Sequence, residues 1–250
     1  MAARNEIESY LNTMLNAQAF KDYGPNGLQV EGRADLRRIV SGVTASRDLI
    51  DAAIVDKADA IIVHHGLFWR GQDGRLVGWL GERVRRLMAH GINLFAYHLP
   101  LDAHPEFGNN AQLGLRLGLL ADARFGEQDI GFAGPAGDNT SLDGLAARVQ
   151  AALGGRAPMV LAGDGRALTR IGWCSGGAQG YFESAVAAGV DAFLTGEVSE
   201  PQAHLAKETG VAFLACGHHA TECFGAPALA AHAAARFGIA HRFIEIDNPA

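Results

Sequence analysis

The fold is decided by two short apolar runs, Leu36-Arg-Arg-Ile-Val-Ser-Gly-Val-Thr44 and Ala60-Ile-Ile-Val-His-His-Gly66. Both are rich in β-branched residues and free of proline, which is typical of buried strands. Residues 49–56, between them, carry apolar side chains at helical spacing and predict a helix. A strand, a helix and a second strand in this order predict a parallel pair with a crossover helix, the basic unit of an α/β fold.

The same alternation continues along the chain. Strands are predicted over residues 39–44, 60–64, 93–98, 167–174, 192–196, 212–216 and 242–246. Helices are predicted over residues 4–17, 49–56, 80–89, 110–119, 142–152, 178–188, 200–208 and 228–237. Strands that alternate with helices in this way predict sheets covered by helices on their faces.

Composition restricts the class of protein. The 250 residues are 48% hydrophobic, enough to bury one large α/β domain or two smaller ones. The net charge of −6 gives no general attraction to nucleic acid or anionic membranes, so charge does not indicate nucleic-acid binding and a small-molecule substrate is favoured. Three cysteines without CxxC spacing fit a reducing compartment. Because no signal peptide or apolar run of membrane-spanning length is recognisable, we predict a cytoplasmic protein with no membrane partner.

Part of the chain repeats itself. When residues 36–66 are slid forward by 132 positions, six identities appear. They place Leu36, Arg38, Ile39, Ala53, Asp59 and Ala60 over Leu168, Arg170, Ile171, Ala185, Asp191 and Ala192. A second match, at an offset of 119, places residues 91–96 over residues 210–215. Any two strand–helix–strand units in a chain rich in alanine and glycine share part of such a pattern, so one explanation is coincidence.

The sharper explanation is an internal duplication. It predicts an α/β protein of two similar halves, each a sheet flanked by helices. Their junction is expected near residues 126–137, where Gly, Asp and Pro cluster, which gives a first half of residues 1–127 and a second half of residues 128–250. A C-terminal strand or helix that crosses back to the first half is compatible with this division.

Six of the ten histidines lie in three short stretches, each after a predicted strand. The stretches are Val63-His-His-Gly66, His98-Leu-Pro-Leu-Asp-Ala-His104 and Gly217-His-His-Ala-Thr-Glu222. Ligands bind at the carboxyl ends of parallel strands, so loops distant in sequence can converge there. A lone buried histidine is usually a hydrogen-bonded core residue, whereas several beside two carboxylates are costly to bury unless a metal compensates. Metal ligation is therefore the preferred interpretation of His64, His65 and His218.

Other residues in these stretches are less determined by pattern alone. Glu222 lies four residues after His218, so a helical turn brings the two onto one face. His98 and His104 flank Asp102, and they either orient that carboxylate or line the pocket. Imidazole and carboxylate ligands suit zinc, manganese or iron, and adjacent histidines suit two neighbouring ions. We therefore predict two divalent metal ions as cofactors.

Several motifs, spread from about residue 20 to residue 222, resemble one known family. They are Asn26-Gly-Leu-Gln-Val-Glu-Gly32, Ala60-Ile-Ile-Val-His-His-Gly66, Tyr97-His-Leu-Pro-Leu-Asp-Ala-His-Pro105 with Gly108-Asn-Asn-Ala-Gln112, Leu194-Thr-Gly-Glu197, and Gly217-His-His-Ala-Thr-Glu222. This set resembles the NIF-three-like family, known in many genomes as GTP cyclohydrolase I type 2, and most closely its bacterial YbgI-like group. The central domain that longer relatives insert between the halves is missing here.

The resemblance implies two similar α/β halves, a dinuclear metal centre in the cleft between them, and assembly into a ring-shaped hexamer. It also assigns metal ligation to five residues, while His219, where relatives can have tyrosine, is treated as a neighbour. The implied ligands are His64, His65, Asp102, His218 and Glu222.

Five ligands do not saturate two metals, which favours catalysis over a structural role. A water shared by two metals loses a proton near neutral pH, and the expected activity is that of a hydrolase. For a GTP cyclohydrolase the attack falls on C8 of the purine, with loss of formate, and Glu197 and His98 are candidates for moving protons. The alternatives are a two-metal phosphoesterase and a metal-loaded ring scaffold that binds protein or nucleic acid in stress or DNA-damage responses.

Phosphate recognition has weaker signals, since the chain has no P-loop. Residues 163–165 and 175–177 are predicted to be simple glycine-rich loops. Arg70 and Arg75 lie in a predicted loop after the histidine pair, where they either bind phosphate, with Trp69 stacked on a base, or belong to a solvated surface.

Overall fold

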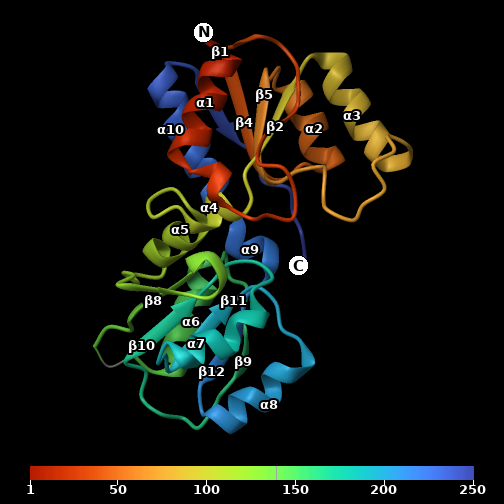
Figure 1. Cartoon of the computed structure of the whole chain (residues 1–250). Coiled ribbons are helices and arrows are strands. Elements are labelled where there is room, and N and C mark those ends of the chain that lie inside the picture. Colours follow the sequence, from red (N-terminus) through yellow and green to blue (C-terminus); the bar gives the residue numbers. More distant parts are fainter. Residues whose placement is uncertain (139) are drawn as a thin grey trace. The chain divides into compact units, whose positions relative to one another are not determined.

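The computed structural model describes residues 1–138 and 140–250, and these form two compact units (Figure 1). The first unit comprises Met1–Leu101 and Gly225–Asp247, and the second comprises Asp102–Phe224 and Asn248–Ala250. Each contains a sheet with helices packed against it, which confirms the α/β prediction. The chain changes unit inside the short helix α4 (Leu99–Ala103), whereas the predicted junction after residue 127 falls inside the second unit.

The first unit is built on a five-stranded sheet in the order β13-β4-β5-β6-β2. Strands β13, β4, β5 and β6 run parallel, and β2 is antiparallel to β6. Its elements are β1 (Ala2–Ala3), α1 (Arg4–Met14), η1 (Ala17–Ala19), β2 (Gly27–Val30), β3 (Asp35–Leu36), β4 (Arg38–Thr44), α2 (Arg47–Val55), β5 (Ala60–His65), α3 (Gly78–His90), β6 (Asn93–Ala96), α10 (Gly225–Phe237) and β13 (Ala240–Phe243).

Both faces of this sheet are buried, because alternate residues of its central strands enter different cores. Ile39 and Ile62 pack in a core with α1 and α10, and Val40 and Ile61 pack in another with α2 and α3. Figure 1 shows the same arrangement, with α1 and α10 on one side of the sheet and α2 and α3 on the other. The near-continuous apolar runs of the sequence reflect this two-sided burial.

The second unit is built on a six-stranded sheet in the order β7-β8-β10-β11-β12-β9. Strands β10, β11 and β12 run parallel, while β7, β8 and β9 join by antiparallel pairing. Its elements are α5 (Asn109–Arg116), β7 (Ala123–Phe125), η2 (Glu127–Asp129), β8 (Gly131–Pro135), α6 (Leu142–Ala152), β9 (Met159–Leu161), β10 (Arg170–Trp173), η3 (Gln179–Tyr181), α7 (Phe182–Ala187), β11 (Ala192–Thr195), α8 (Glu200–Thr209), β12 (Ala212–Ala215) and α9 (His218–Glu222).

One face of the second sheet packs against α5 and α6, in a core that contains Ile171 and Leu194. The other face is aromatic, because Phe193 and Phe213 contact each other with ring centroids 5.7 Å apart and Phe182 of α7 lies 5.0 Å from Phe213. These parallel strands therefore also lie between two layers of apolar side chains.

The main corrections to the predicted elements concern sheet edges. Strand β8 (Gly131–Pro135) lies within the glycine- and proline-rich stretch that was expected to join the halves, and the edge strands β2, β7 and β9 were not predicted. Strand β13 begins two residues earlier than predicted, at Ala240. Antiparallel strands near an edge can be very short, like the three residues of β9, or can contain Gly and Pro, like β8, so apolar pattern alone did not reveal them.

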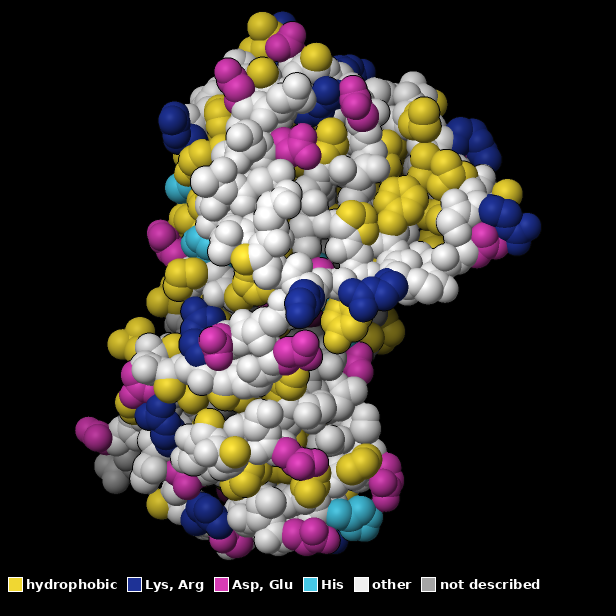
Figure 2. Space-filling view, viewed as in Figure 1, with side chains coloured by type: hydrophobic (Ala, Val, Ile, Leu, Met, Phe, Trp, Pro, Cys, Tyr) yellow, Lys and Arg dark blue, Asp and Glu magenta, His cyan; other side chains and the backbone are white. Residues whose placement is uncertain are grey.

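The surface carries no strong electrostatic signal in the view of Figure 2, where positive and negative side chains are interspersed over the visible face of the described residues. Across residues 1–138 and 140–250, no helix combines the length and the apolar character that a bilayer span requires.

Candidate metal centre

Three imidazoles gather at the carboxyl edge of the first sheet. His64 and His65 end β5, and His98 follows β6, the neighbouring parallel strand. One nitrogen from each of the three rings lies within 4.8 Å of those from the other two. The ring centroid of His64 is 4.6 Å from that of His65 and 4.9 Å from that of His98. Adjacent strands thus bring together residues more than thirty positions apart.

Each of these rings is oriented through its Nδ1 atom. His64 Nδ1 hydrogen-bonds the Tyr97 carbonyl oxygen at 3.0 Å, and His65 Nδ1 hydrogen-bonds Thr44 Oγ1 at 3.0 Å. His98 Nδ1 pairs with Asp22 Oδ1 at 2.7 Å. Metal-binding histidines commonly use one ring nitrogen for such a partner and the other for the metal, so Nε2 is the ligand atom that this geometry favours.

Asp22 is a site residue that the sequence patterns did not reveal. Its side chain is 3% exposed and also accepts hydrogen bonds from Asn26 Nδ2 at 2.8 Å and from the Leu99 backbone N–H at 2.9 Å. Burial raises the pKa of Asp22, but hydrogen bonding and charge attraction from His98, with the Asn26 hydrogen bond, outweigh it and leave the pKa below its usual value. Asp22 therefore holds His98 as a carboxylate anion.

Two carboxylates and an imidazole gather in the second unit. Asp102 and Glu222 are 6% and 3% exposed, and a carboxylate oxygen of one lies within 4.8 Å of one of the other. Helix α9 places His218 one turn before Glu222, as their spacing predicts, with His218 Nε2 at 3.1 Å from Glu222 Oε2. Two buried carboxylates at this separation repel each other, so the group attracts a cation.

His218 supplies positive charge to this group. Its Nε2 faces Glu222, and its Nδ1 lies 2.7 Å from Glu197 Oε1. The hydrogen bond to Glu222, supported by Glu197 and opposed by burial, raises the pKa of His218 to about 9. In the metal-free protein a proton on His218 thus partly balances the carboxylates.

A glycine allows the backbone to approach the carboxylate of Glu222. Gly176, in the loop after β10, has φ of +66°, and a Cβ atom there would overlap Glu222 Oε1 and lie 3.3 Å from His218 Nε2. The loop of residues 175–177, which the sequence indicated only as a weak phosphate signal, therefore packs directly against candidate metal ligands.

Asp102 is held by Asn109, which follows it in the chain, and by Ser175 of the loop of residues 175–177. Asn109 Nδ2 donates to Asp102 Oδ1 at 2.9 Å, and Ser175 Oγ lies 3.3 Å from the same oxygen. Asn110 accepts from the Ser175 backbone N–H at 2.7 Å, which fixes the loop. His104 has another role, because its Nδ1 accepts from the Phe107 backbone N–H at 3.0 Å and its ring stacks on Phe107.

The predicted site residues thus form two groups within the described chain. The first unit brings together His64, His65 and His98, and the second brings together Asp102, His218, Glu222 and Glu197. His104, which the sequence placed beside Asp102, is instead fixed within a local turn, where its Nδ1 accepts from the Glu106 and Phe107 backbone N–H groups.

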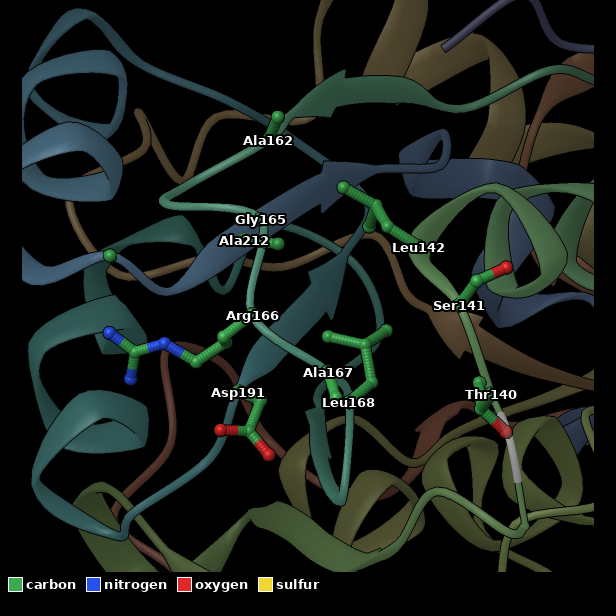
Figure 3. A pocket seen from close by; sticks show the side chains of 11 residues that line it. Thr140, Ser141, Leu142, Ala162, Gly165, Arg166, Ala167, Leu168, Asp191 and Ala212 are labelled. Carbon is green, nitrogen blue, oxygen red and sulfur yellow. The ribbon is translucent and has the colours of Figure 1, made fainter.

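A pocket of about 400 Å³ lies at the opposite, amino-terminal edge of the second sheet (Figure 3). Arg166 and Asp191 line it, but Arg166 is paired with Asp164 at 2.6 Å and Asp191 accepts from the Thr169 and Arg170 backbone N–H groups at 2.8 and 3.0 Å. These polar groups stabilise the strand ends, so this pocket carries no comparable chemistry.

The chain matches a known family over almost its whole length. The model of the Duf34/NIF3 (NGG1p interacting factor 3) family matches residues 2–249. A GTP cyclohydrolase 1 type 2 homolog from Neisseria meningitidis serogroup A is 49% identical over 250 residues, which cover 100% of both chains. The protein of the same name from Pseudomonas aeruginosa is 49% identical over 239 residues, which cover 94% of each chain.

Solved structures agree with the fold. The protein ybgI, described as of unknown function, has a TM-score of 0.95 at 44% identity, with 100% of both chains covered. The protein TTHA1606 from Thermus thermophilus has a TM-score of 0.90 at 35% identity, again with 100% of both chains covered.

Proposed function

The chain belongs to the Duf34/NIF3 family, and from that premise we propose that it is a hydrolase that uses two divalent metal ions. The proposed ligands are His64, His65, Asp102, His218 and Glu222. Zinc, manganese and iron all suit imidazole and carboxylate ligands.

One observation carries the proposal. Asp102 and Glu222 are both buried, and a carboxylate oxygen of one lies within 4.8 Å of a carboxylate oxygen of the other. Such a pair is unfavourable in a folded protein unless protons or cations compensate it. His64 and His65 of the first unit add donors whose Nδ1 atoms are held by protein partners, as in metal sites. The residues therefore fit the predicted metal ions in both charge and donor type.

A pair of divalent ions, when bound, lowers the pKa of water and polarises the bond that is hydrolysed. The protein itself supplies orientation and proton transfer. Glu197 holds the Nδ1 proton of His218, and Asp22 holds His98 in the same manner. Glu197 and His98 remain the proposed proton carriers. Glu197 hydrogen-bonds the candidate ligand His218, and His98 lies beside the candidate ligand His64 while its own Nδ1 pairs with Asp22.

The proposed substrate is a nucleotide or a related heterocycle, and GTP is the specific candidate. The names of the relatives support this choice, since they are called GTP cyclohydrolase 1 type 2 homologs. The corresponding reaction opens the imidazole ring of the purine at C8 and releases formate.

The test is to reconstitute the protein with zinc, manganese or iron, incubate it with GTP, and measure formate and pterin products. We expect formate from the wild type and none from Glu222→Ala. Glu200→Gln is the matched control, because Glu200 is 80% exposed and pairs only with His204 among the contacts of the described residues. A fully metallated wild type that releases no formate would overturn the cyclohydrolase assignment. The hexamer implied by the resemblance is checked separately, by light scattering.

A further inference from the structure

A second pocket, of about 370 Å³, lies within the first unit beside the imidazole group. Its walls come from two loop segments, residues 22–25 and residues 68–70. Ligand pockets commonly have volumes of roughly 300–1,000 Å³. This pocket is shallow and open to solvent, so a planar ring of nucleobase size can lie against its walls.

The two segments are fixed against each other. The Arg70 backbone N–H donates to the Tyr23 carbonyl oxygen at 2.6 Å, and the Arg70 side chain donates to the Asp22 carbonyl oxygen. Gly24 packs so close to the Phe68 carbonyl that a Cβ atom at this position would overlap its oxygen. The walls of the pocket are therefore held in place by backbone contacts as well as by side chains.

Aromatic side chains connect this pocket to the candidate ligands. The ring centroid of Trp69 lies 5.0 Å from that of His98 in an edge-on arrangement, and 6.0 Å from that of His65. Tyr23 also approaches His98 edge-on, at 6.1 Å. A molecule bound against Trp69 and Tyr23 would lie next to the imidazoles.

The chemistry of the walls points to a particular kind of ligand. Tyr23 is 58% exposed, and Phe68 and Trp69 are partly buried, so flat aromatic surface borders the pocket. The exposed Arg70 guanidinium lies 6.0 Å from the centroid of the Tyr23 ring. Aromatic faces bind planar rings by stacking, and a guanidinium binds phosphate. By contrast, Arg75 pairs with Asp73 at 2.6 Å and does not line the pocket.

We infer that the pocket formed by Tyr23, Trp69 and Arg70 binds a nucleoside phosphate, with the base stacked on the aromatic side chains and the phosphate paired with Arg70. The inference rests on the proposed function for the reaction at the neighbouring site. Binding itself requires no turnover, so the two ideas can be tested separately.

The experiment is calorimetric titration of metal-loaded protein with guanosine 5′-monophosphate, guanosine and ribose 5-phosphate. We expect the monophosphate to bind more tightly than either fragment. Trp69→Leu should weaken its binding about 5- to 150-fold, the range for loss of one base–aromatic stack, and Trp69→Phe should restore most of it. Arg70→Gln should weaken binding of the monophosphate more than binding of guanosine, because Arg70 both pairs with the phosphate and holds the Asp22 carbonyl, and Arg75→Gln should change neither.

Metal content and formate release are measured on the same preparations. If formate is absent but the monophosphate binds in a Trp69-dependent way, the pocket assignment stands and the cyclohydrolase proposal fails. If Trp69→Leu retains its metal and melting temperature and binds the monophosphate as the wild type does, the pocket assignment is overturned. Equal affinity for the monophosphate and ribose 5-phosphate would overturn it as well.

Discussion

The two units present different candidate metal ligands on central strands that pair in the same order and register. In the first, Ala60 of β5 pairs with Ile39 and Asn93, and in the second, Ala192 of β11 pairs with Ile171 and Ala212. These partners obey the offsets of 132 and 119 found in the sequence. The five-residue helices α4 and α9 also correspond at the second offset, since they begin at Leu99 and His218. The shared register supports the predicted duplication, which stays a prediction.

The difference lies in the donors that follow the equivalent strands. His65 ends β5, whereas Glu197 occupies the equivalent position after β11. The first unit gathers three imidazoles and the second gathers carboxylates around His218. The first unit therefore supplies neutral candidate donors and the second supplies charged ones.

The course of the chain adds a further parallel. After α4 it continues into the second unit, where α5 packs in the core, and after α9 it returns to the first unit, where α10 packs. Each five-residue helix is thus followed by a helix that belongs to the other unit. The sequence allowed for such a return only at the C-terminus.

Gly176→Ala should produce the largest change in metal content, because it disturbs the pair of buried carboxylates, Asp102 and Glu222, that distinguishes the second unit. A side chain at φ of +66° costs about 1–3 kcal/mol, and its Cβ would also overlap Glu222 Oε1. We expect a lower melting temperature and loss of metal from elemental analysis. Gly180→Ala is the control, since its Cβ would meet no heavy atom within 4 Å. Normal metal content in Gly176→Ala would contradict this account of the group.

Asn109→Ala should weaken metal binding without abolishing it. Its amide holds Asp102 Oδ1 at 2.9 Å, and loss of such a partner typically lowers metal affinity about 10- to 100-fold. The affinity is measured by competition with a chelator. Gln112→Ala, on the same helix, is the control, because the Gln112 side chain donates to the Glu106 carbonyl oxygen at 2.7 Å, and this change should leave the affinity unchanged. Equal affinities in both variants would show that Asp102 needs no such support.

Metal affinity should rise with pH until about 9, the pKa to which the carboxylates raise His218. The raised pKa favours the protonated ring in the metal-free protein, and the Nε2 proton must leave before that atom can ligate a metal. Below pH 9 we therefore expect the affinity to increase about tenfold per pH unit. Glu197→Gln removes one of the groups that raise this pKa, so its plateau should begin at lower pH. An affinity independent of pH between 6.5 and 9 would contradict the assignment of His218.

The smallest effect on the metal site is expected at two carboxylates in equivalent positions, one in each unit. Asp59 accepts from the Arg37 and Arg38 backbone N–H groups at 2.8 and 3.1 Å, and Asp191 accepts from those of Thr169 and Arg170 at 2.8 and 3.0 Å. Alanine at either position should reduce the free energy of unfolding by about 1–3 kcal/mol and leave metal content unchanged. Chemical denaturation checks this, with Glu183→Ala, an exposed change on α7, as the control. Very unequal losses would weaken the case for equivalent frames.

Sequence predicted the parallel strands at the centre of each sheet, because burial on both faces requires nearly continuous apolar runs such as Ile61 to Val63. It missed β2, β8 and β9, whose pairing depends on neighbours far away in the chain. Among site residues, the histidines and carboxylates were visible as clusters after strands. Asp22 and Ser175 were not, because their roles arise only when separate loops meet.

X-ray absorption of the zinc- or manganese-loaded protein tests the central claim most directly. We predict two ions per chain, a ligand shell of imidazole nitrogen and carboxylate oxygen, and a metal–metal separation of about 3.5–4 Å. Glu222→Ala should lose the metal–metal signal. A single isolated ion in the wild type, or a shell without imidazole, would contradict the assignment of a dinuclear centre to these residues.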